Sequence, residues 1–161
     1  MRILFVCLGN ICRSPMAEAI FQHLLERRAL TDRMGCDSAG TANYHPGKRP
    51  DFRTLHVLEQ RGIFTGHRAR QVNPDDFTQF HYILAMDQDN LHQLEQMHQR
   101  HPAPTATLLS MIELVPTHVN SSRHLGIPDP YYGEIQDFQE VFDLLYPACE
   151  ALLSRISLEV C

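Results

Sequence analysis

Apolar residues gather in four short runs that predict β-strands. Residues Arg2–Cys7 form the strongest run, which is typical of a fully buried strand. We predict a short second strand at Met34–Ser38, a third at His81–Met86 and a weaker fourth at Thr105–Leu109. Near-continuous apolar strands are typical of parallel sheets, which are buried on both faces.

Between these strands, apolar residues recur at helical spacing. The first helix follows Cys7, and we expect Ser14 to cap it and Pro15 to occupy its first turn. Its apolar stripe consists of Ala17, Ile20, Phe21, Leu24 and Leu25. A second helix is predicted from Asp51 to Gln60, with Gly62 ending it. Its inward residues are expected to be Phe52, Leu55 and Leu58.

Three further helices are predicted from capping signals and apolar stripes. The stretch "NPDDF" at 73–77 combines an N-cap, a proline and an acidic first turn, which predicts a short helix. Asp87 caps a helix that runs to about Arg100, and the last helix begins near Asp137. The long stripe of that last helix consists of Phe138, Val141, Phe142, Leu145, Cys149, Leu152 and Ile156.

The length and the order of elements predict one domain over residues 1–161, large enough to bury a sizeable core. Strands that alternate with helices imply an α/β fold, in which helices cover both faces of a parallel sheet. The longest irregular segment is His118–Pro128, and long loops of this kind tend to be functional or mobile.

Composition and charge narrow the function classes. The net charge of −5 argues against a nucleic-acid partner, because phosphate-backbone binders carry a basic surplus. No apolar run approaches the roughly 18 to 20 residues of a membrane span, so we predict no membrane insertion. The N-terminal apolar run at Ile3–Val6 is too short for a signal peptide, which favours a cytoplasmic protein.

The chain has five cysteines, and an odd number without an export signal argues against a disulfide framework. A cysteine is then packed, catalytic or bound to metal. Because no C-x2-C pair occurs, we predict no metal site and no cofactor. A solvated helix face accounts for the nearby His92, His98 and His101.

Cys7 is followed by Arg13 six positions later, but this spacing alone is not a signal. The same spacing recurs at Cys149 and Arg155, where Cys149 belongs to the apolar stripe of the last helix and Arg155 falls near solvent. The context of Cys7 differs, because it ends a strand and therefore lies at the carboxyl edge of the sheet, where open α/β folds bind ligands.

The loop after Cys7 predicts a phosphate site. Gly9 and Asn10 tolerate the positive φ angles of a tight turn, whose backbone N–H groups can converge on one anion. The following helix adds its positive N-terminus, and Arg13 adds a planar fork that matches two phosphate oxygens. The same positive field favours the Cys7 thiolate, so we expect attack at phosphorus and a phosphocysteine intermediate.

The leaving group of such a reaction needs a proton. Asp129, between Pro128 and Pro130 and ahead of the last helix, is a candidate on a restricted loop. As a neutral acid it would protonate the leaving oxygen, and as a carboxylate it would then activate water. An aspartate in a proline-flanked turn is also a common structural feature, so from the residues alone this role stays open.

Five motifs occur in one order along nearly the whole chain. They are "VCLGNICRSP" at 6–15, "SAGT" at 38–41, "HRARQ" at 67–71, "MD" at 86–87 and "DPYYG" at 129–133. With them the chain resembles the low-molecular-weight protein tyrosine phosphatase family. The resemblance implies a single-domain three-layer sandwich with a four-stranded parallel sheet, flavodoxin-like, with a phosphate-binding loop after the first strand.

The resemblance also implies roles for residues. Cys7 would be the nucleophile, Arg13 the transition-state clamp and Asp129 the acid and then the base. The remaining phosphate-binding residues would be Leu8, Gly9, Asn10, Ile11, Cys12 and Ser14, with Ser14 stabilising the departing thiolate. Ser38 and His67 would support the loop by hydrogen bonds with Asn10; taken alone, they are a turn residue and a surface histidine.

We expect an aromatic pocket wall that stacks on a phenyl ring. Tyr131 and Tyr132 follow the acid directly, and Tyr44 stands where some relatives carry tryptophan. The expected partner is a phosphotyrosine-containing protein, such as a tyrosine kinase or one of its targets.

Three alternatives share the loop or the fold. A thioredoxin-linked arsenate reductase needs further cysteines near the third strand, and "YILAMDQDN" has none. A protein-arginine phosphatase carries threonine where this chain has Ile11, whose apolar bulk favours an aryl phosphate over a guanidinium. A phosphotyrosine-binding pseudophosphatase should lack one catalytic residue, whereas Cys7, Arg13 and Asp129 are all present.

Overall fold

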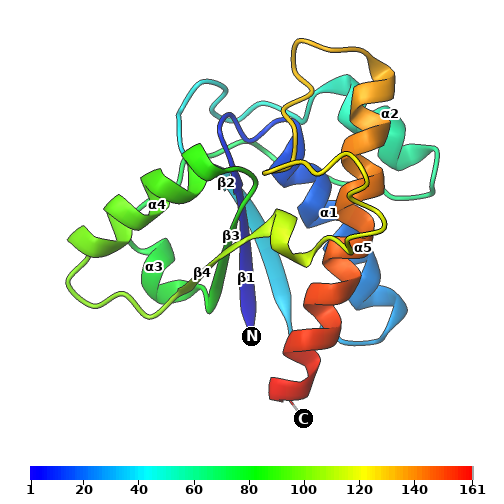
Figure 1. Ribbon diagram of the computed structural model, residues 1–161. Coiled ribbons are helices and arrows are strands. Elements are labelled where there is room, and N and C mark those ends of the chain that lie inside the picture. The colour runs from blue at the N-terminus through cyan, green and yellow to red at the C-terminus, as the bar shows by residue number, and fades with distance from the viewer. Residues whose placement is uncertain (161) are drawn as a thin grey trace.

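Four parallel strands form one sheet in the order β2-β1-β3-β4 (Figure 1). They are β1 (Arg2–Cys7), β2 (Gly35–Gly40), β3 (Tyr82–Ala85) and β4 (Thr107–Ser110). The computed structural model describes residues 1–160, so that Cys161 lies outside the described residues. All four predicted strands are present; β1 has the predicted bounds, and the boundaries of the other three shift by one to two residues.

Three helices cover one face of this sheet: α1 (Arg13–Arg27), α2 (Phe52–Glu59) and α5 (Ile135–Val160) (Figure 1). The side chains of Ile3 and Phe5 on β1 pack into this layer, and neither is exposed. The predicted stripe of the last helix is buried throughout, and this layer forms the larger part of the core.

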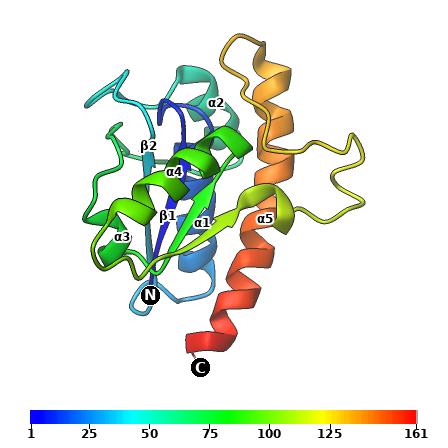
Figure 2. The same cartoon turned by 60° about the vertical axis from the view of Figure 1, so that its left-hand side comes forward.

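The opposite face carries α3 (Asp76–Gln79) and α4 (Gln88–Arg100) (Figure 2). Along β1, Leu4 and Val6 alternate with Ile3 and Phe5 and therefore point to this second face, where they pack in one cluster with Phe77 and Leu94. A short 3₁₀ helix, η1 (Met111–Leu114), follows β4 and was not predicted. The three-layer α/β sandwich expected from the sequence is therefore confirmed.

The strand order places a crevice at the carboxyl ends of β1 and β3. From β1 the chain crosses to β2 on one side, and β3 lies on the other side of β1. In doubly wound sheets ligands bind at such a switch point. Cys7 ends β1 here, and Asp87, which comes two residues after the end of β3, caps α4 by accepting a hydrogen bond from Asn90 N at 2.8 Å. The predicted capping role of Asp87 is thus correct.

Three local predictions are wrong. Asn73 is not the N-cap of α3; Asp75 holds that position, and the Asn73 side chain accepts a hydrogen bond from Asp75 N at 3.0 Å. Ser14 is not the N-cap of α1; Cys12 holds that position without a side-chain cap, and Ser14 turns its hydroxyl toward Cys7. Phe52 does not face inward but is 77% exposed. The buried residues of α2 are Thr54, Val57 and Leu58, because this helix is short and only its α1- and α5-facing side is covered.

Within residues 1–160, no helix combines the length and the apolar character that crossing a membrane would require.

Candidate active site

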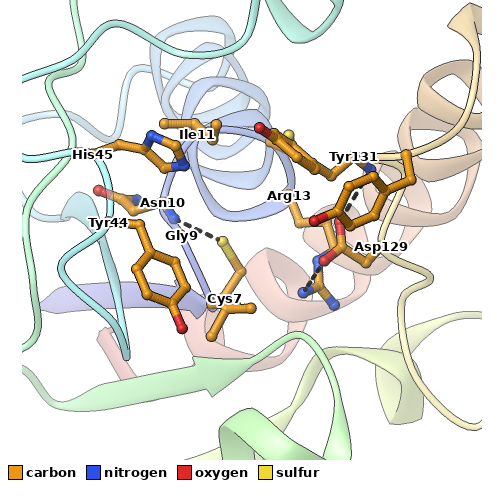
Figure 3. A pocket seen from close by; sticks show the side chains of 12 residues that line it. Cys7, Gly9, Asn10, Ile11, Arg13, Tyr44, His45, Asp129 and Tyr131 are labelled. Carbon is orange, nitrogen blue, oxygen red and sulfur yellow. Dashed lines mark hydrogen bonds and ion pairs between the residues drawn. The ribbon is translucent and has the colours of Figure 1, made fainter.

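A pocket of about 260 Å³ lies at the carboxyl edge of β1, and Figure 3 shows its side chains. Its lining consists of Cys7, Leu8, Gly9, Asn10, Ile11, Cys12, Arg13, Tyr44, His45, Asp129, Tyr131 and Tyr132. The structure therefore brings together in one cavity the three predicted catalytic residues, five of the predicted loop residues and the three predicted wall tyrosines.

Cys7 lies at the base of this pocket, 3% exposed, with the loop curled around its sulfur. The backbone N–H of Asn10 points at Cys7 Sγ, 3.3 Å away (Figure 3). The hydroxyl of Ser14 lies 3.0 Å from the same sulfur. The Cys7 sulfur therefore meets a backbone N–H and a side-chain hydroxyl at the floor of the pocket.

Asn10 holds the loop in this shape. It is buried and adopts a left-handed φ of 57°, which asparagine tolerates better than most residues. Its amide nitrogen donates to Ser14 Oγ at 2.8 Å and to Ser38 Oγ at 3.0 Å. Its amide oxygen accepts from His67 Nε2 at 2.8 Å and from Arg70 N at 2.9 Å. Ser38 and His67 thus contact Asn10 as the resemblance implied.

Glu18 on α1 completes this network. Its Oε2 accepts from Ser38 Oγ at 2.5 Å and lies 2.8 Å from His67 Nδ1. Glu18, Asp37 and His67 offer ligand atoms within 4.8 Å of one another, as a metal site would. Both ring nitrogens of His67 already face acceptors, however, and Arg70 pairs with Asp37 at 3.0 Å. The cluster is therefore accounted for as support for the loop.

Arg13 is 2% exposed and is held from three sides. Its Nη1 donates to Asp87 Oδ2 at 2.6 Å and to the Ile127 carbonyl at 3.0 Å, and its Nη2 lies 3.5 Å from Asp129 Oδ2. Burial would lower the pKa of Arg13, but the charge of Cys7 and the two carboxylates outweigh burial and raise it. Arg13 therefore supplies a permanent positive charge beside the sulfur.

Asp129 lies at the mouth of the pocket, and its side chain is 46% exposed. Its Oδ1 accepts a hydrogen bond from Tyr131 N at 3.1 Å, and the carboxyl group lies beside the Arg13 guanidinium (Figure 3). The Asp129 carboxyl group therefore lies where the pocket opens to solvent.

Aromatic rings form the rim. The rings of Tyr44 and His45 are 6.4 Å apart, as are those of His45 and Tyr131, and Tyr131 contacts Tyr132 at 4.9 Å. Tyr132 is 97% exposed, so it contributes less wall than Tyr131, which is 39% exposed. His45 links the two sides of the rim (Figure 3).

Cys12, five positions after Cys7, is a different kind of thiol. Burial, together with the negative charges of Asp51 and Cys7, raises the pKa of Cys12. It therefore remains protonated and packs in the core. The Cys149–Arg155 pair lies far along α5, with Cys149 fully buried and Arg155 exposed, as expected for a spacing without function.

Sequence reasoning missed three residues of this site. Asp87 was predicted as a helix cap and as part of the "MD" motif but was given no role in the site, although the end of a third parallel strand had to meet the end of the first at this edge. His45 could have been suggested by its neighbour Tyr44. Glu18 had no signal, because its contact with His67 spans 49 positions of the chain and depends on the fold.

A comparison with known proteins shows which family the chain belongs to. The profile of the low molecular weight phosphotyrosine protein phosphatases matches residues 2–160. The chain belongs to this family. The human low molecular weight phosphotyrosine protein phosphatase is 39% identical over 153 residues, which cover 95% of this chain and 94% of the human protein. The Bacillus subtilis low molecular weight protein-tyrosine-phosphatase YfkJ is 42% identical over 158 residues, covering 98% and 96% of the two chains.

Solved structures agree with this assignment to a family of cysteine-based phosphatases. The crystal structure of Bacillus subtilis YfkJ superimposes with a TM-score of 0.87 at 40% identity, covering 99% of this chain and 96% of the other. A Drosophila arginine phosphatase superimposes with a TM-score of 0.88 at 36% identity, covering 96% and 97%. The solved structures therefore show the fold of the family. The similar proteins include tyrosine phosphatases and an arginine phosphatase.

Proposed function

We propose that this protein hydrolyses phosphotyrosine in proteins, and small aryl phosphates, through a phosphocysteine intermediate. The observation that carries the proposal is the convergence of Cys7, Arg13 and Asp129 on one pocket with an aromatic rim. The whole chain, residues 1–161, acts as one low-molecular-weight phosphatase domain.

In the first step, Cys7 Sγ attacks phosphorus, and the phosphorus–oxygen bond to the leaving group breaks. Asp129 gives its proton to the departing oxygen, so that a neutral phenol leaves. Arg13 and the N–H groups of residues 8 to 14 hold the three equatorial oxygens as their charge develops.

In the second step, a water molecule attacks the phosphocysteine. Asp129, now a carboxylate, takes a proton from this water, and the sulfur–phosphorus bond breaks. Ser14, whose hydroxyl lies 3.0 Å from Cys7 Sγ, stabilises the departing thiolate by a hydrogen bond. Inorganic phosphate leaves, and the starting protonation states are restored.

The geometry favours phosphotyrosine over shorter phosphoamino acids. Cys7 lies at the floor of the pocket while the rim is formed by Tyr44, His45 and Tyr131. A substrate must keep its backbone at the rim and bring phosphorus to the sulfur, which phosphotyrosine reaches and phosphoserine and phosphothreonine do not. Stacking with the rim rings contributes about 0.5–1.5 kcal/mol beyond area burial.

Phosphoarginine is the second candidate, because the Drosophila arginine phosphatase superimposes well on this chain. Ile11 lines the pocket and offers a guanidinium no hydrogen-bond partner. An unpaired polar donor costs about 1–3 kcal/mol, which corresponds to a roughly ten- to hundredfold preference against phosphoarginine.

The test compares kcat/KM for phosphotyrosine, phosphoarginine and phosphoserine in the wild type and in Ile11→Thr. We expect efficient phosphotyrosine hydrolysis, weak phosphoarginine hydrolysis and nearly no activity on phosphoserine, with a shift toward phosphoarginine in the variant. A wild type that prefers phosphoarginine contradicts the proposed substrate, and unchanged ratios in Ile11→Thr show that Ile11 does not select it.

We further propose that the protein acts in the cytoplasm on phosphotyrosine proteins, such as a tyrosine kinase or its targets. Support comes from the cysteine chemistry, which needs a reduced thiol, and from the net charge of −5, which does not favour nucleic acid.

A further inference from the structure

Arg53, on the first turn of α2, holds the segment that carries Asp129. Its Nη2 donates to the carbonyl oxygen of Tyr131 at 2.9 Å, and its Nη1 donates to that of Gly133 at 2.9 Å. Tyr131 and Gly133 lie 78 and 80 positions further along the chain. One side chain therefore fixes two backbone points immediately after Asp129.

Arg53 is itself held rigidly. Asp51 accepts from its Nε at 3.0 Å and from its Nη2 at 2.9 Å, and the guanidinium lies 4.3 Å from the ring centroid of Phe138 on α5. Its side chain is 18% exposed and that of Asp51 is 10% exposed. The pKa of Arg53 is raised, first by its hydrogen bonds to Asp51. A planar, paired and stacked guanidinium loses little further freedom when it binds the loop.

The same turn of α2 also holds the phosphate loop. The N–H of Asp51 donates to the Ile11 carbonyl at 2.8 Å, and Thr54 Oγ1 donates to the Cys12 carbonyl at 3.2 Å. The start of α2 thus contacts both the loop with the nucleophile and, through Arg53, the loop with the acid.

We infer that Arg53 is a positioning residue that sets the place of Asp129 relative to Cys7; this rests on the acid role of Asp129 in the proposed function. The Asp129 side chain is nearly half exposed, and apart from Tyr131 N its contact is the 3.5 Å approach to Arg13. Its place is therefore determined by the backbone that Arg53 holds. Proton transfer needs a heavy-atom distance of about 2.6–3.2 Å, and a misplacement of about 1 Å can cost 10²-fold.

The leaving group gives the readout. p-Nitrophenolate leaves with little help from an acid, whereas phenolate needs a proton. In Arg53→Ala we expect kcat/KM to fall at least about tenfold more with phenyl phosphate than with p-nitrophenyl phosphate. This ratio of substrates does not depend on the fraction of folded enzyme, so partial unfolding cannot imitate the effect.

Arg61 offers a matched control. It lies over Phe142 of α5 at 4.2 Å, as Arg53 lies over Phe138, and donates to the Val57 carbonyl, but it does not contact the acid loop. Arg61→Ala should leave the substrate ratio unchanged. Arg53→Lys, which keeps the charge but loses the fork, should show an intermediate ratio.

Asp129→Ala and the double variant separate the two proposals. In Asp129→Ala, kcat/KM should fall much more with phenyl phosphate than with p-nitrophenyl phosphate. Adding Arg53→Ala to this variant should change the ratio of the two kcat/KM values little further. Equal losses on both substrates in Asp129→Ala overturn the acid role itself. A selective loss in Asp129→Ala beside an unchanged ratio in Arg53→Ala, or the same fall in Arg61→Ala, overturns the inference about Arg53 and leaves the acid role intact.

Discussion

Arg13 and Asp87 form a short ion pair, with Nη1 2.6 Å from Oδ2, although 74 positions separate them in the chain. Asp87 at the same time caps α4 through Oδ1. One carboxylate therefore orients the Arg13 guanidinium and begins the helix after β3. This double contact links the segments that follow the carboxyl ends of β1 and β3.

Asp87 substitutions can separate these two contacts. Asp87→Asn keeps a capping side chain but loses the charge that holds Arg13, so we expect inorganic phosphate to inhibit about tenfold more weakly. Asp87→Ala should show the same weaker inhibition and should have a free energy of unfolding about 0.5–2 kcal/mol lower than that of Asp87→Asn, since the cap is gone. Inhibition constants and urea unfolding measure the two effects. Phosphate inhibition equal to wild type in both variants would contradict the orienting role.

Cys7→Ser and Arg13→Ala should both abolish turnover, but for different reasons. The serine variant keeps Arg13 and the N–H groups of the loop, so it should still bind phosphate. The alanine variant loses the charged fork, and a loss of at least about 10²–10³ in rate is expected together with weak phosphate binding. Calorimetric titration with phosphate distinguishes the two. A Cys7→Ser protein with normal turnover would end the proposed mechanism.

The second cysteine–arginine pair supplies the control for this experiment. Arg155 is exposed on α5 and has the same spacing from Cys149 as Arg13 has from Cys7. Arg155→Ala should leave the rate within about twofold of wild type, because surface substitutions away from a site change free energies by about 0.5 kcal/mol or less.

Asn10 combines a left-handed backbone with four hydrogen bonds of its side chain. Asn10→Ala loses these hydrogen bonds and strains the backbone, so we expect the free energy of unfolding to fall by about 2–4 kcal/mol. Asn10→Gly loses the same bonds without the strain. Although glycine ordinarily costs about 0.5–1 kcal/mol relative to alanine in ordered elements, here it should be the less destabilising change. Urea unfolding gives the order, and the opposite order would show that φ is not constrained in solution.

Local patterns predicted most of the fold, because periodicity and capping are properties of neighbouring residues. The strand that ends at Cys7, the cap at Asp87 and the buried stripe from Phe138 all follow from segments of fewer than twenty residues. The error at Phe52 has the same origin: helical spacing shows that one face is apolar but not how much of that face the other helices cover.

The loop residues of the candidate site could be predicted because they lie together in one short segment, from Cys7 to Ser14. What the sequence did not contain are contacts between distant segments. The hydrogen bond from Arg53 to the Tyr131 carbonyl depends on how α2 packs on α5, and no sequence pattern at either position predicts it. Ser38 and His67 were expected only through the family resemblance, for the same reason.

The Asp51–Arg53 pair predicts a stability that depends on pH. Burial opposes ionisation of Asp51, but hydrogen bonds from Arg53 outweigh it, so the pKa of Asp51 lies below its ordinary value of 3.8. Between the folded and the unfolded pKa, the unfolded chain binds more protons. The contribution of this pair to stability is therefore fully present above about pH 4 and is lost as the pH falls through the folded pKa.

Asp51→Asn isolates this contribution, because asparagine can still cap α2 but carries no charge. The wild type should be more stable than the variant at neutral pH, and the two free energies of unfolding should converge as the pH falls below about 4. Taking the difference between the two proteins removes the titration of all other carboxylates. Arg53→Ala should show the same flattened dependence, since the arginine is what lowers the pKa of Asp51. Urea unfolding between about pH 3 and pH 6 measures the three curves. Wild-type and Asp51→Asn curves that stay parallel over this range would show that the ion pair does not stabilise the folded protein.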